Sequence, residues 1–199
     1  DVSGLSTKPQ DPSERITREP RALRRHLLEW MLTWLHGSIG LPLVRKSCYP
    51  GGARSVLLFR VDSDYGDREA CGRLLDALDR LEVRSTWFLH LQAHDGWLDR
   101  FAHLQGHELA LHAWRHADFR DPAARRLDAG RAAAAWNKAF PGRPPRGYAS
   151  PFGRFNPGTA RMLADGVPGI GRFEYASDFA YDADNLPSHP MAGGLPLQI

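Results

Sequence analysis

From residue 54 onward, the sequence alternates short apolar runs with amphipathic helical segments. The apolar runs Ser55–Val61, Ser85–Leu91 and His107–Ala113 have the length of buried strands. Helical segments at Arg68–Leu81 and Asp95–Leu104 follow the first two runs. Strands that alternate with helices form parallel sheets, because each helical crossover returns the chain to the same edge. The alternation therefore predicts an α/β fold, a parallel sheet or barrel covered by helices.

The alternation continues toward the C-terminus with shorter segments. A helix is predicted from Pro122 to about Phe140 and another over residues 156–165, with short strands at Arg146–Ser150 and Arg172–Ser177. In parallel α/β folds, binding and catalytic side chains gather at the C-terminal ends of the strands. Polar residues that directly follow a predicted strand are therefore the first candidates for a functional site.

The residues before this region divide into two segments. Residues 1–20 are polar and proline-rich without periodicity, which predicts a flexible lead. Residues 21–53 are predicted to form an N-terminal amphipathic helix over 21–36, followed by a Gly- and Pro-punctuated connector over 37–52. The barrel domain is then assigned to residues 54–199.

The predicted helix over 21–36 allows two interpretations. In the first, its apolar residues dock on the barrel domain; they are Leu23, Leu27, Trp30, Met31 and Trp34. In the second, the helix lies on a membrane surface, with its arginines toward anionic headgroups and its tryptophans at the boundary; the arginines are Arg21, Arg24 and Arg25.

Composition excludes several classes of protein. The net charge is +3, from 26 basic and 23 acidic residues, and this excess is too small to indicate a nucleic-acid partner. The 2 cysteines cannot form a disulfide framework or a thiolate zinc site. No apolar run reaches the roughly 18 residues that a membrane-spanning helix requires. We expect a cytoplasmic protein that can contact the inner membrane peripherally.

Two aspartates, Asp62 and Asp64, directly follow the first predicted strand. Residues two apart on a strand point to the same face. Two like charges placed together are costly unless a cation or a proton lies between them. Loops after strands are commonly rich in Asp, but the position directly after a buried apolar run favours a metal-binding or catalytic role.

Three pairs of histidines have the H-x-x-x-H spacing, which is weak evidence without position. The pair His103/His107 precedes its strand and should lie at the opposite edge of the sheet. His112 and His116 lie on either side of the C-terminal end of the predicted strand His107–Ala113, at the same edge of the sheet as Asp62 and Asp64. Asp64, His112 and His116 are therefore predicted to form a three-ligand N/O site for a divalent metal. In the third pair, His90/His94, one residue could line the mouth of the site.

The segment Asp62-Ser63-Asp64 and the segment from Gly106 to His116 together resemble the polysaccharide deacetylase (NodB-type) family. Within it, the closer likeness is to the 4-deoxy-4-formamido-L-arabinose-phosphoundecaprenol deformylases of lipopolysaccharide modification. The resemblance covers about residues 55–190. It implies a distorted (β/α) barrel in which Asp62 is the general base. Asp64, His112 and His116 would hold the metal, zinc foremost, with cobalt, manganese, nickel or iron as alternatives.

The sequence departs from the family pattern in two places. Where the family has Arg-x-Pro-aromatic, Pro151-Phe152 is present but Ala149 stands at the Arg position, so Arg60 or Arg154 is expected to orient the base. The late Leu-x-His motif that supplies the general acid is not found. His189 is a substitute candidate, and the alternative is an acid beyond Ile199. Residues 54–199 are also fewer than the roughly 250 of a complete barrel, so we expect the barrel to be incomplete at its C-terminus.

The resemblance implies hydrolysis of an N-acyl group, formyl or acetyl, on an amino sugar of a bacterial cell-surface polysaccharide or lipopolysaccharide (O-antigen) precursor. The sugar would be lipid-linked or nucleotide-linked. The residues expected to contact it are Tyr65, Trp114, Tyr148, Phe152, Arg154 and Asp178. Two alternatives stay open at this point. One is a glycosyltransferase that holds a divalent ion with Asp62 and Asp64, and the other is a non-catalytic carbohydrate-binding relative.

Overall fold

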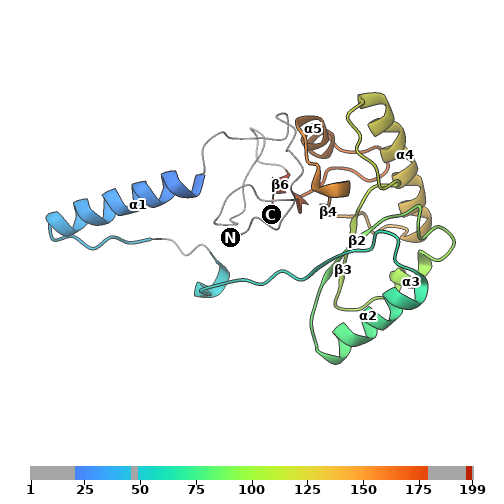
Figure 1. Ribbon diagram of the computed structural model, residues 1–199, viewed down its shortest axis with the longest axis horizontal. Helices are drawn as coiled ribbons and strands as arrows, with labels where there is room; N and C mark the ends of the chain where they lie inside the picture. Colours follow the sequence, from blue (N-terminus) through green and yellow to red (C-terminus); the bar gives the residue numbers. More distant parts are fainter. Residues whose placement is uncertain (1–20, 46–48, 179–195, 199) are drawn as a thin grey trace.

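The computed structural model describes residues 21–45, 49–178 and 196–198, and its centre is one parallel sheet (Figure 1). The six strands follow one another across the sheet in chain order, and every neighbouring pair is parallel. They are β1 (Arg60–Asp62), β2 (Thr86–Leu89), β3 (Glu108–Leu111), β4 (Gly147–Tyr148), β5 (Tyr175–Ala176) and β6 (Leu197–Gln198). The predicted α/β class with a parallel sheet is therefore confirmed.

Helices connect the strands and cover one side of the sheet (Figure 1). They are α2 (Arg68–Arg80), α3 (Asp99–Ala102), α4 (Pro122–Ala139) and α5 (Pro157–Asp165). The three longer ones begin at a side-chain cap, in which Asp67, Asp121 or Asn156 accepts the backbone N–H of the residue three positions later. Such caps satisfy N–H groups that the first helical turn leaves without partners.

The two faces of the sheet have different surroundings. Trp87 and Leu89 of β2 lie in the main core with residues of the covering helices, and the Trp87 and Phe101 rings lie 5.8 Å apart. Phe88 points to the opposite, inner face, where it packs with Ala110 and Ala149. Because side chains alternate along a strand, the residues that share the parity of Phe88 and Ala110 also lie on this inner face.

Several predicted strands are longer than the observed ones. The predicted strand Ser55–Val61 begins only at Arg60, and the apolar side chains of residues 56–59 are exposed. The reason is that β1 pairs only with β2 among the described strands, and this pairing starts where Thr86 N–H donates to the Phe59 carbonyl. The strands near residues 147 and 175 have two residues each, and α3 has four.

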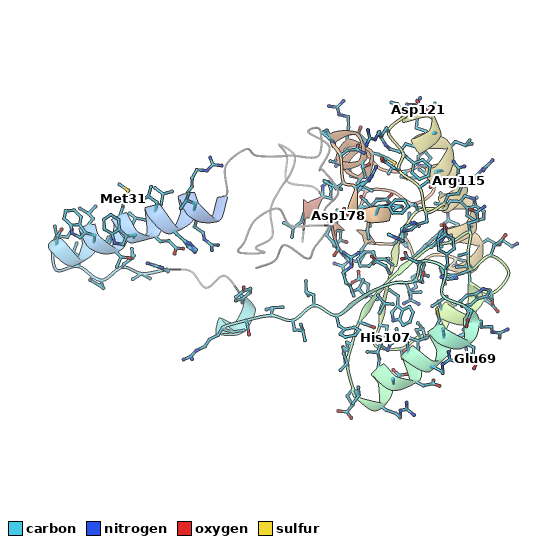
Figure 2. The ribbon with its side chains drawn as sticks, viewed as in Figure 1. Met31, Glu69, His107, Arg115, Asp121 and Asp178 are labelled. Carbon is cyan, nitrogen blue, oxygen red and sulfur yellow. The ribbon has the colours of Figure 1, made fainter. Side chains whose placement is uncertain are left out.

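The N-terminal helix α1 (Arg21–Ser38) stands apart from the sheet (Figure 1). Its apolar side chains are exposed to solvent in the described part of the chain, including Trp30 at 66% and Trp34 at 65%, and Met31 projects from the helix far from the sheet (Figure 2). The interpretation that this helix docks on the barrel domain is therefore wrong for the described residues. None of the described helices combines the length and the hydrophobicity needed to cross a membrane.

Candidate metal centre and active site

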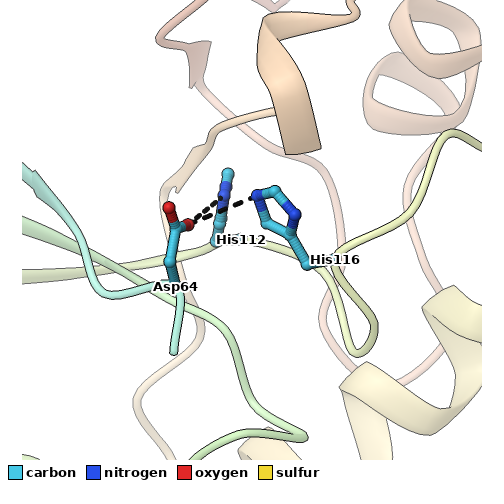
Figure 3. A group of neighbouring side chains, drawn as sticks. All are labelled: Asp64, His112 and His116. Carbon is cyan, nitrogen blue, oxygen red and sulfur yellow. Dashed lines mark ion pairs between the residues drawn. The ribbon is translucent and has the colours of Figure 1, made fainter. Parts of the chain in front are cut away.

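The C-terminal ends of β1 and β3 bring Asp64, His112 and His116 together (Figure 3). Asp64 Oδ1 lies 3.1 Å from His112 Nε2 and 3.3 Å from His116 Nε2. The three candidate ligand atoms all lie within 4.8 Å of one another. Because β1, β2 and β3 are adjacent and parallel, their C-terminal ends meet at one edge of the sheet, as the sequence pattern predicts.

The electrostatics of this group favour a bound cation. His112 Nδ1 donates to the Ala149 carbonyl at 2.9 Å, so the Nε2 of the neutral ring carries a lone pair toward Asp64. Burial lowers the pKa of His112, which keeps the ring neutral. Within the described residues, neither the buried Asp64 Oδ1 nor the buried His112 Nε2 has a hydrogen-bond partner. Two acceptors that face each other without a proton repel, and a cation between them removes this cost.

The chemistry of the donor atoms fits a catalytic divalent ion. Two imidazole nitrogens and one carboxylate oxygen are ligands that zinc and other first-row metals accept. Three protein ligands leave coordination positions for water or substrate, whereas structural zinc sites are closed by four. The residues present therefore fit a metal ion at this position.

Strained backbone is concentrated at this site. Four non-glycine residues in the described chain have a positive φ, and three of them are Asp64 (37°), Ala113 (66°) and Phe152 (59°). A non-glycine residue in this region costs on the order of 1–3 kcal/mol and persists where the surrounding structure enforces it. Asp64 is itself a candidate ligand, and Ala113 follows the candidate ligand His112. The ring centroids of Phe152 and His116 lie 4.4 Å apart.

Asp62 is fixed by an arginine from its own strand. Arg60 Nη2 donates to both Asp62 oxygens, at 2.6 and 2.7 Å, and Arg60 Nη1 donates to the carbonyl and the hydroxyl of Ser177. The guanidinium also lies over the Phe88 ring, 4.8 Å from its centroid. Arg154, the other candidate to orient the base, instead pairs with Asp118 at 2.7 Å. Of the two arginines, Arg60 is therefore the one in contact with Asp62.

Two of the predicted substrate residues lie beside the candidate ligands. The exposed Tyr65 ring is edge-on to His90 at 5.0 Å and lies 5.9 Å from His116. The half-exposed Phe152 ring approaches the same His116 ring. Tyr65 and Phe152 therefore flank the candidate metal centre.

Three other predicted substrate residues are buried or partly buried. Tyr148 is buried in the core and packs edge-on against Phe173, because its position on β4 points to the helix-covered side. Trp114 is partly buried against the same core. Asp178 is buried, and its two carboxylate oxygens accept hydrogen bonds from the backbone N–H and the hydroxyl of Ser150. Tyr148 is therefore directed into the core, Asp178 is buried close to the Arg60–Asp62 pair, and His189 lies outside the described residues.

Sequence reasoning missed the role of two buried polar side chains. Asp128 of α4 accepts the backbone N–H groups of Trp114 and Arg115, each at 3.0 Å, and His90 contacts the backbone of Asp64 and His116. Burial raises the pKa of Asp128, although these hydrogen bonds oppose the shift. The sequence shows Asp128 only as a single aspartate in an Ala-rich helix, and His90 only as one member of the His90/His94 pair. Neither signal indicates a partner far away in the sequence.

Replacing Asp178 with asparagine is expected to make stability less dependent on pH. Burial raises the pKa of Asp178 to about 7, against about 3.9 in an unfolded chain. The folded state therefore favours the protonated carboxyl, and the wild type loses stability as pH rises through this interval. Between pH 5 and pH 8, the wild type should lose about 2–3 kcal/mol of unfolding free energy that Asp178→Asn does not lose. Urea unfolding at both pH values measures this, and an equal difference at both would contradict it.

Comparisons with known proteins agree with this fold. A structure of a polysaccharide deacetylase candidate from Mycobacterium smegmatis is 22% identical, with a TM-score of 0.59, and the match covers 79% of this chain and 61% of that chain. This likeness confirms the predicted distorted (β/α) barrel fold. Among curated proteins, none matches the chain.

Two further solved structures match over shorter stretches. A CE4 family pseudoenzyme from Bacillus anthracis is 18% identical with a TM-score of 0.49, over 58% of this chain and 41% of that chain. A family 4 acetyl xylan esterase from Clostridium thermocellum, solved with a cobalt ion, is 19% identical with a TM-score of 0.48, over 60% of this chain and 56% of that chain. The chain thus spans between 41% and 61% of the length of these three solved chains.

The sequence profile of the polysaccharide deacetylase family matches residues 50–166. This range contains β1 to β4, the three candidate metal ligands and the Arg60–Asp62 pair. Because the match spans more than half of the chain, the protein belongs to the polysaccharide deacetylase family.

Proposed function

We propose that the protein hydrolyses an N-acyl group on an amino sugar with the help of a divalent metal ion. The observation that carries the proposal is the pairing of two features at one edge of the sheet. The first is the group of three facing ligand atoms from Asp64, His112 and His116. The second is Asp62, a partly exposed carboxylate that Arg60 fixes in place. Metal-dependent amide hydrolysis uses a cation that polarises the acyl carbonyl and a base that accepts a proton from water, and these two features supply the sites for both.

Asp62 is assigned the role of general base. Its carboxylate is held by two short hydrogen bonds from Arg60 Nη2, which fix its direction. The side chain keeps 35% of its surface exposed, so a water molecule can approach it. Asp62 would accept the proton of that water as its oxygen attacks the acyl carbon, because a carboxylate within hydrogen-bond reach is a competent base.

Asp64, His112 and His116 would hold the ion. A bound divalent metal would lower the pKa of a water molecule to roughly 7 and polarise the acyl carbonyl. We place a backbone N–H of the turn at Pro151–Gly153 beside the developing oxyanion. A histidine is assigned to protonate the leaving amine; His189 is the candidate within this sequence.

The proposed substrate is a 4-formamido-arabinose or a related N-acyl amino sugar of a cell-surface polysaccharide or lipopolysaccharide precursor, attached to a lipid or nucleotide carrier. Support comes from the sequence resemblance and from Tyr65 and Phe152, whose rings flank the ligand group and offer apolar faces to a sugar. Formyl and acetyl groups differ by one methyl, a difference typically worth about 1–3 kcal/mol of discrimination. Direct assay of both acyl groups is therefore required.

The proposal is tested by incubating the purified protein with N-formyl and N-acetyl amino sugars and measuring formate and acetate. Release that a chelator abolishes is expected. Metal binding without release from any of these sugars would instead support the non-catalytic carbohydrate-binding alternative. Transfer of sugar from a nucleotide-sugar donor would support the glycosyltransferase alternative.

We further propose that α1 binds the surface of an anionic membrane, where a lipid-linked substrate would be presented. Support comes from its exposed tryptophans and from the exposed Arg24 near its start. Arg45 donates to Glu29 and Thr33, so the chain after the helix covers part of the polar face, while the apolar side chains remain exposed.

Replacing Trp30 and Trp34 together with alanine is expected to weaken binding to vesicles that contain an anionic phospholipid. Each indole is worth about 1 kcal/mol at the interface, so the double variant should partition roughly 30-fold less. Vesicle co-sedimentation measures this. Leu81→Ala is the matched control, because Leu81 is 71% exposed but lies at the end of α2. Equal sedimentation of all three proteins would contradict the proposal.

A further inference from the structure

His90 follows β2, the strand between the two that carry the candidate metal ligands. Its side chain is almost completely buried, with 1% of its surface exposed. It shares the parity of Phe88 and therefore lies on the inner face of the sheet, beside Tyr65 and His116. His90 belongs neither to the ligand group nor to the Arg60–Asp62 pair.

Both ring nitrogens of His90 are used by the backbone of ligand residues. His90 Nδ1 lies 2.8 Å from the Asp64 carbonyl oxygen, and His90 Nε2 lies 3.1 Å from the His116 backbone nitrogen. A carbonyl can only accept and a backbone N–H can only donate, so His90 carries its proton on Nδ1 and accepts at Nε2. The neutral ring in this tautomer satisfies both contacts at once.

Each of these contacts acts on a segment whose conformation needs support. Asp64 has a φ of 37°, and its carbonyl is the group that His90 binds. The loop after β3 turns at Ala113, whose φ is 66°, and three successive N–H groups then face buried acceptors. Asp128 accepts the first two, from Trp114 and Arg115, and His90 accepts the third, from His116.

The backbone of His90 also contacts the loop after β1, which carries Asp64. His90 N–H donates to Ser63 Oγ at 3.0 Å, and Ser63 lies between the two aspartates. The buried ring of His94 contacts that hydroxyl through Nε2 at 2.7 Å. Rotation or loss of the His90 ring would therefore release Asp64 and His116 independently, since no other described side chain contacts the backbone of both.

We propose that His90 is a positioning residue that holds Asp64 and His116 at the separation a metal ion requires. The proposal rests on the proposed function only in that these residues bind a metal. Groups that orient metal ligands from outside the coordination sphere typically change metal affinity by about 10- to 100-fold when they are removed. His90 would act through the backbone of the ligand residues.

The test measures metal binding and does not depend on substrate turnover. In His90→Phe the ring volume is kept and both hydrogen bonds are lost, so the dissociation constant for Zn²⁺, measured by competition with a chromophoric chelator, should rise about 10- to 100-fold. The visible absorption spectrum of the Co²⁺-loaded protein should change as well, because the ligands would no longer share one fixed arrangement. His90→Asn keeps a donor near the Nδ1 position and His90→Gln keeps an acceptor near the Nε2 position. Each should recover part of the affinity.

His107→Phe is the matched control. His107 is a buried histidine with contacts on both ring nitrogens, to Ser85 and Asp79, at the opposite edge of the sheet. Its replacement should lower the midpoint of thermal unfolding and leave the Zn²⁺ affinity and the Co²⁺ spectrum unchanged. If His90→Phe does not fold, the asparagine and glutamine variants carry the comparison.

A folded His90→Phe protein with wild-type Zn²⁺ affinity and Co²⁺ spectrum would overturn the positioning role while leaving the proposed function intact. A wild-type protein that binds neither ion would overturn the metal site itself, and the positioning role with it. The two failures are therefore distinguishable in one set of titrations.

Discussion

Asp62→Asn is expected to lower the rate of N-acyl hydrolysis by about 100- to 10,000-fold, the range that a positioned general base contributes. Asparagine has nearly the same shape as aspartate, and its oxygen can still accept from Arg60 Nη2. It cannot accept a proton from water. The loss should appear in kcat with little change in KM, because the residue is assigned to a step after substrate binding. Formate or acetate release under saturating substrate measures this.

The control for Asp62→Asn is its metal content. Asp62 is not one of the three candidate ligands, so the variant should bind Zn²⁺ as the wild type does. Asp76→Asn, an exposed substitution on α2, should leave both rate and metal content unchanged. Full activity of a metal-loaded Asp62→Asn protein would remove Asp62 from the role of base.

His112→Ala is expected to abolish stable metal binding. The substitution removes a nitrogen that lies 3.1 Å from Asp64 Oδ1, and among the described residues the group contains no fourth His, Cys, Asp or Glu that could replace it. The affinity for Zn²⁺ should fall by more than the roughly 100-fold upper range for residues outside the coordination sphere. Metal analysis after dialysis against a weak chelator measures the loss, and acyl release should fall in parallel.

His112→Ala also deletes a nearly completely buried side chain, so its effect on folding needs a matched control. His107→Ala removes a buried imidazole that precedes the same strand at the other edge of the sheet. It should destabilise the fold and retain the metal. A His112→Ala protein that keeps one ion per chain with wild-type affinity would contradict the ligand assignment.

The sequence was informative where chemistry and strand position coincide. Asp64 directly follows one apolar run, and His112 and His116 straddle the end of another. Parallel strands bring such positions to one edge without further information, so the three residues could be placed together before their distances were known. The same reasoning placed His107 at the opposite edge, where its ring contacts Asp79 and Ser85.

Other parts of the site could not be read from the sequence, because they depend on contacts between distant segments. Tyr148 occupies a strand end like a site residue, but the face it occupies follows from the register of a two-residue strand. The hydrogen bonds of His90 reach backbone groups 26 positions away in either direction. Because every residue has the same backbone groups, no residue type in the sequence indicates such a contact. The pairing of Arg60 with Asp62 was easier to anticipate, because both lie two residues apart on one strand face.

The central claim is that Asp64, His112 and His116 hold an ion on which acyl release depends. Its most direct test is to strip the purified protein of metal, reload it with Zn²⁺, and measure bound metal and acyl release in the same samples. The account predicts that release from an N-acyl amino sugar disappears on stripping and returns in proportion to the ion bound, to one ion per chain. Acyl release that persists in metal-free protein would contradict it.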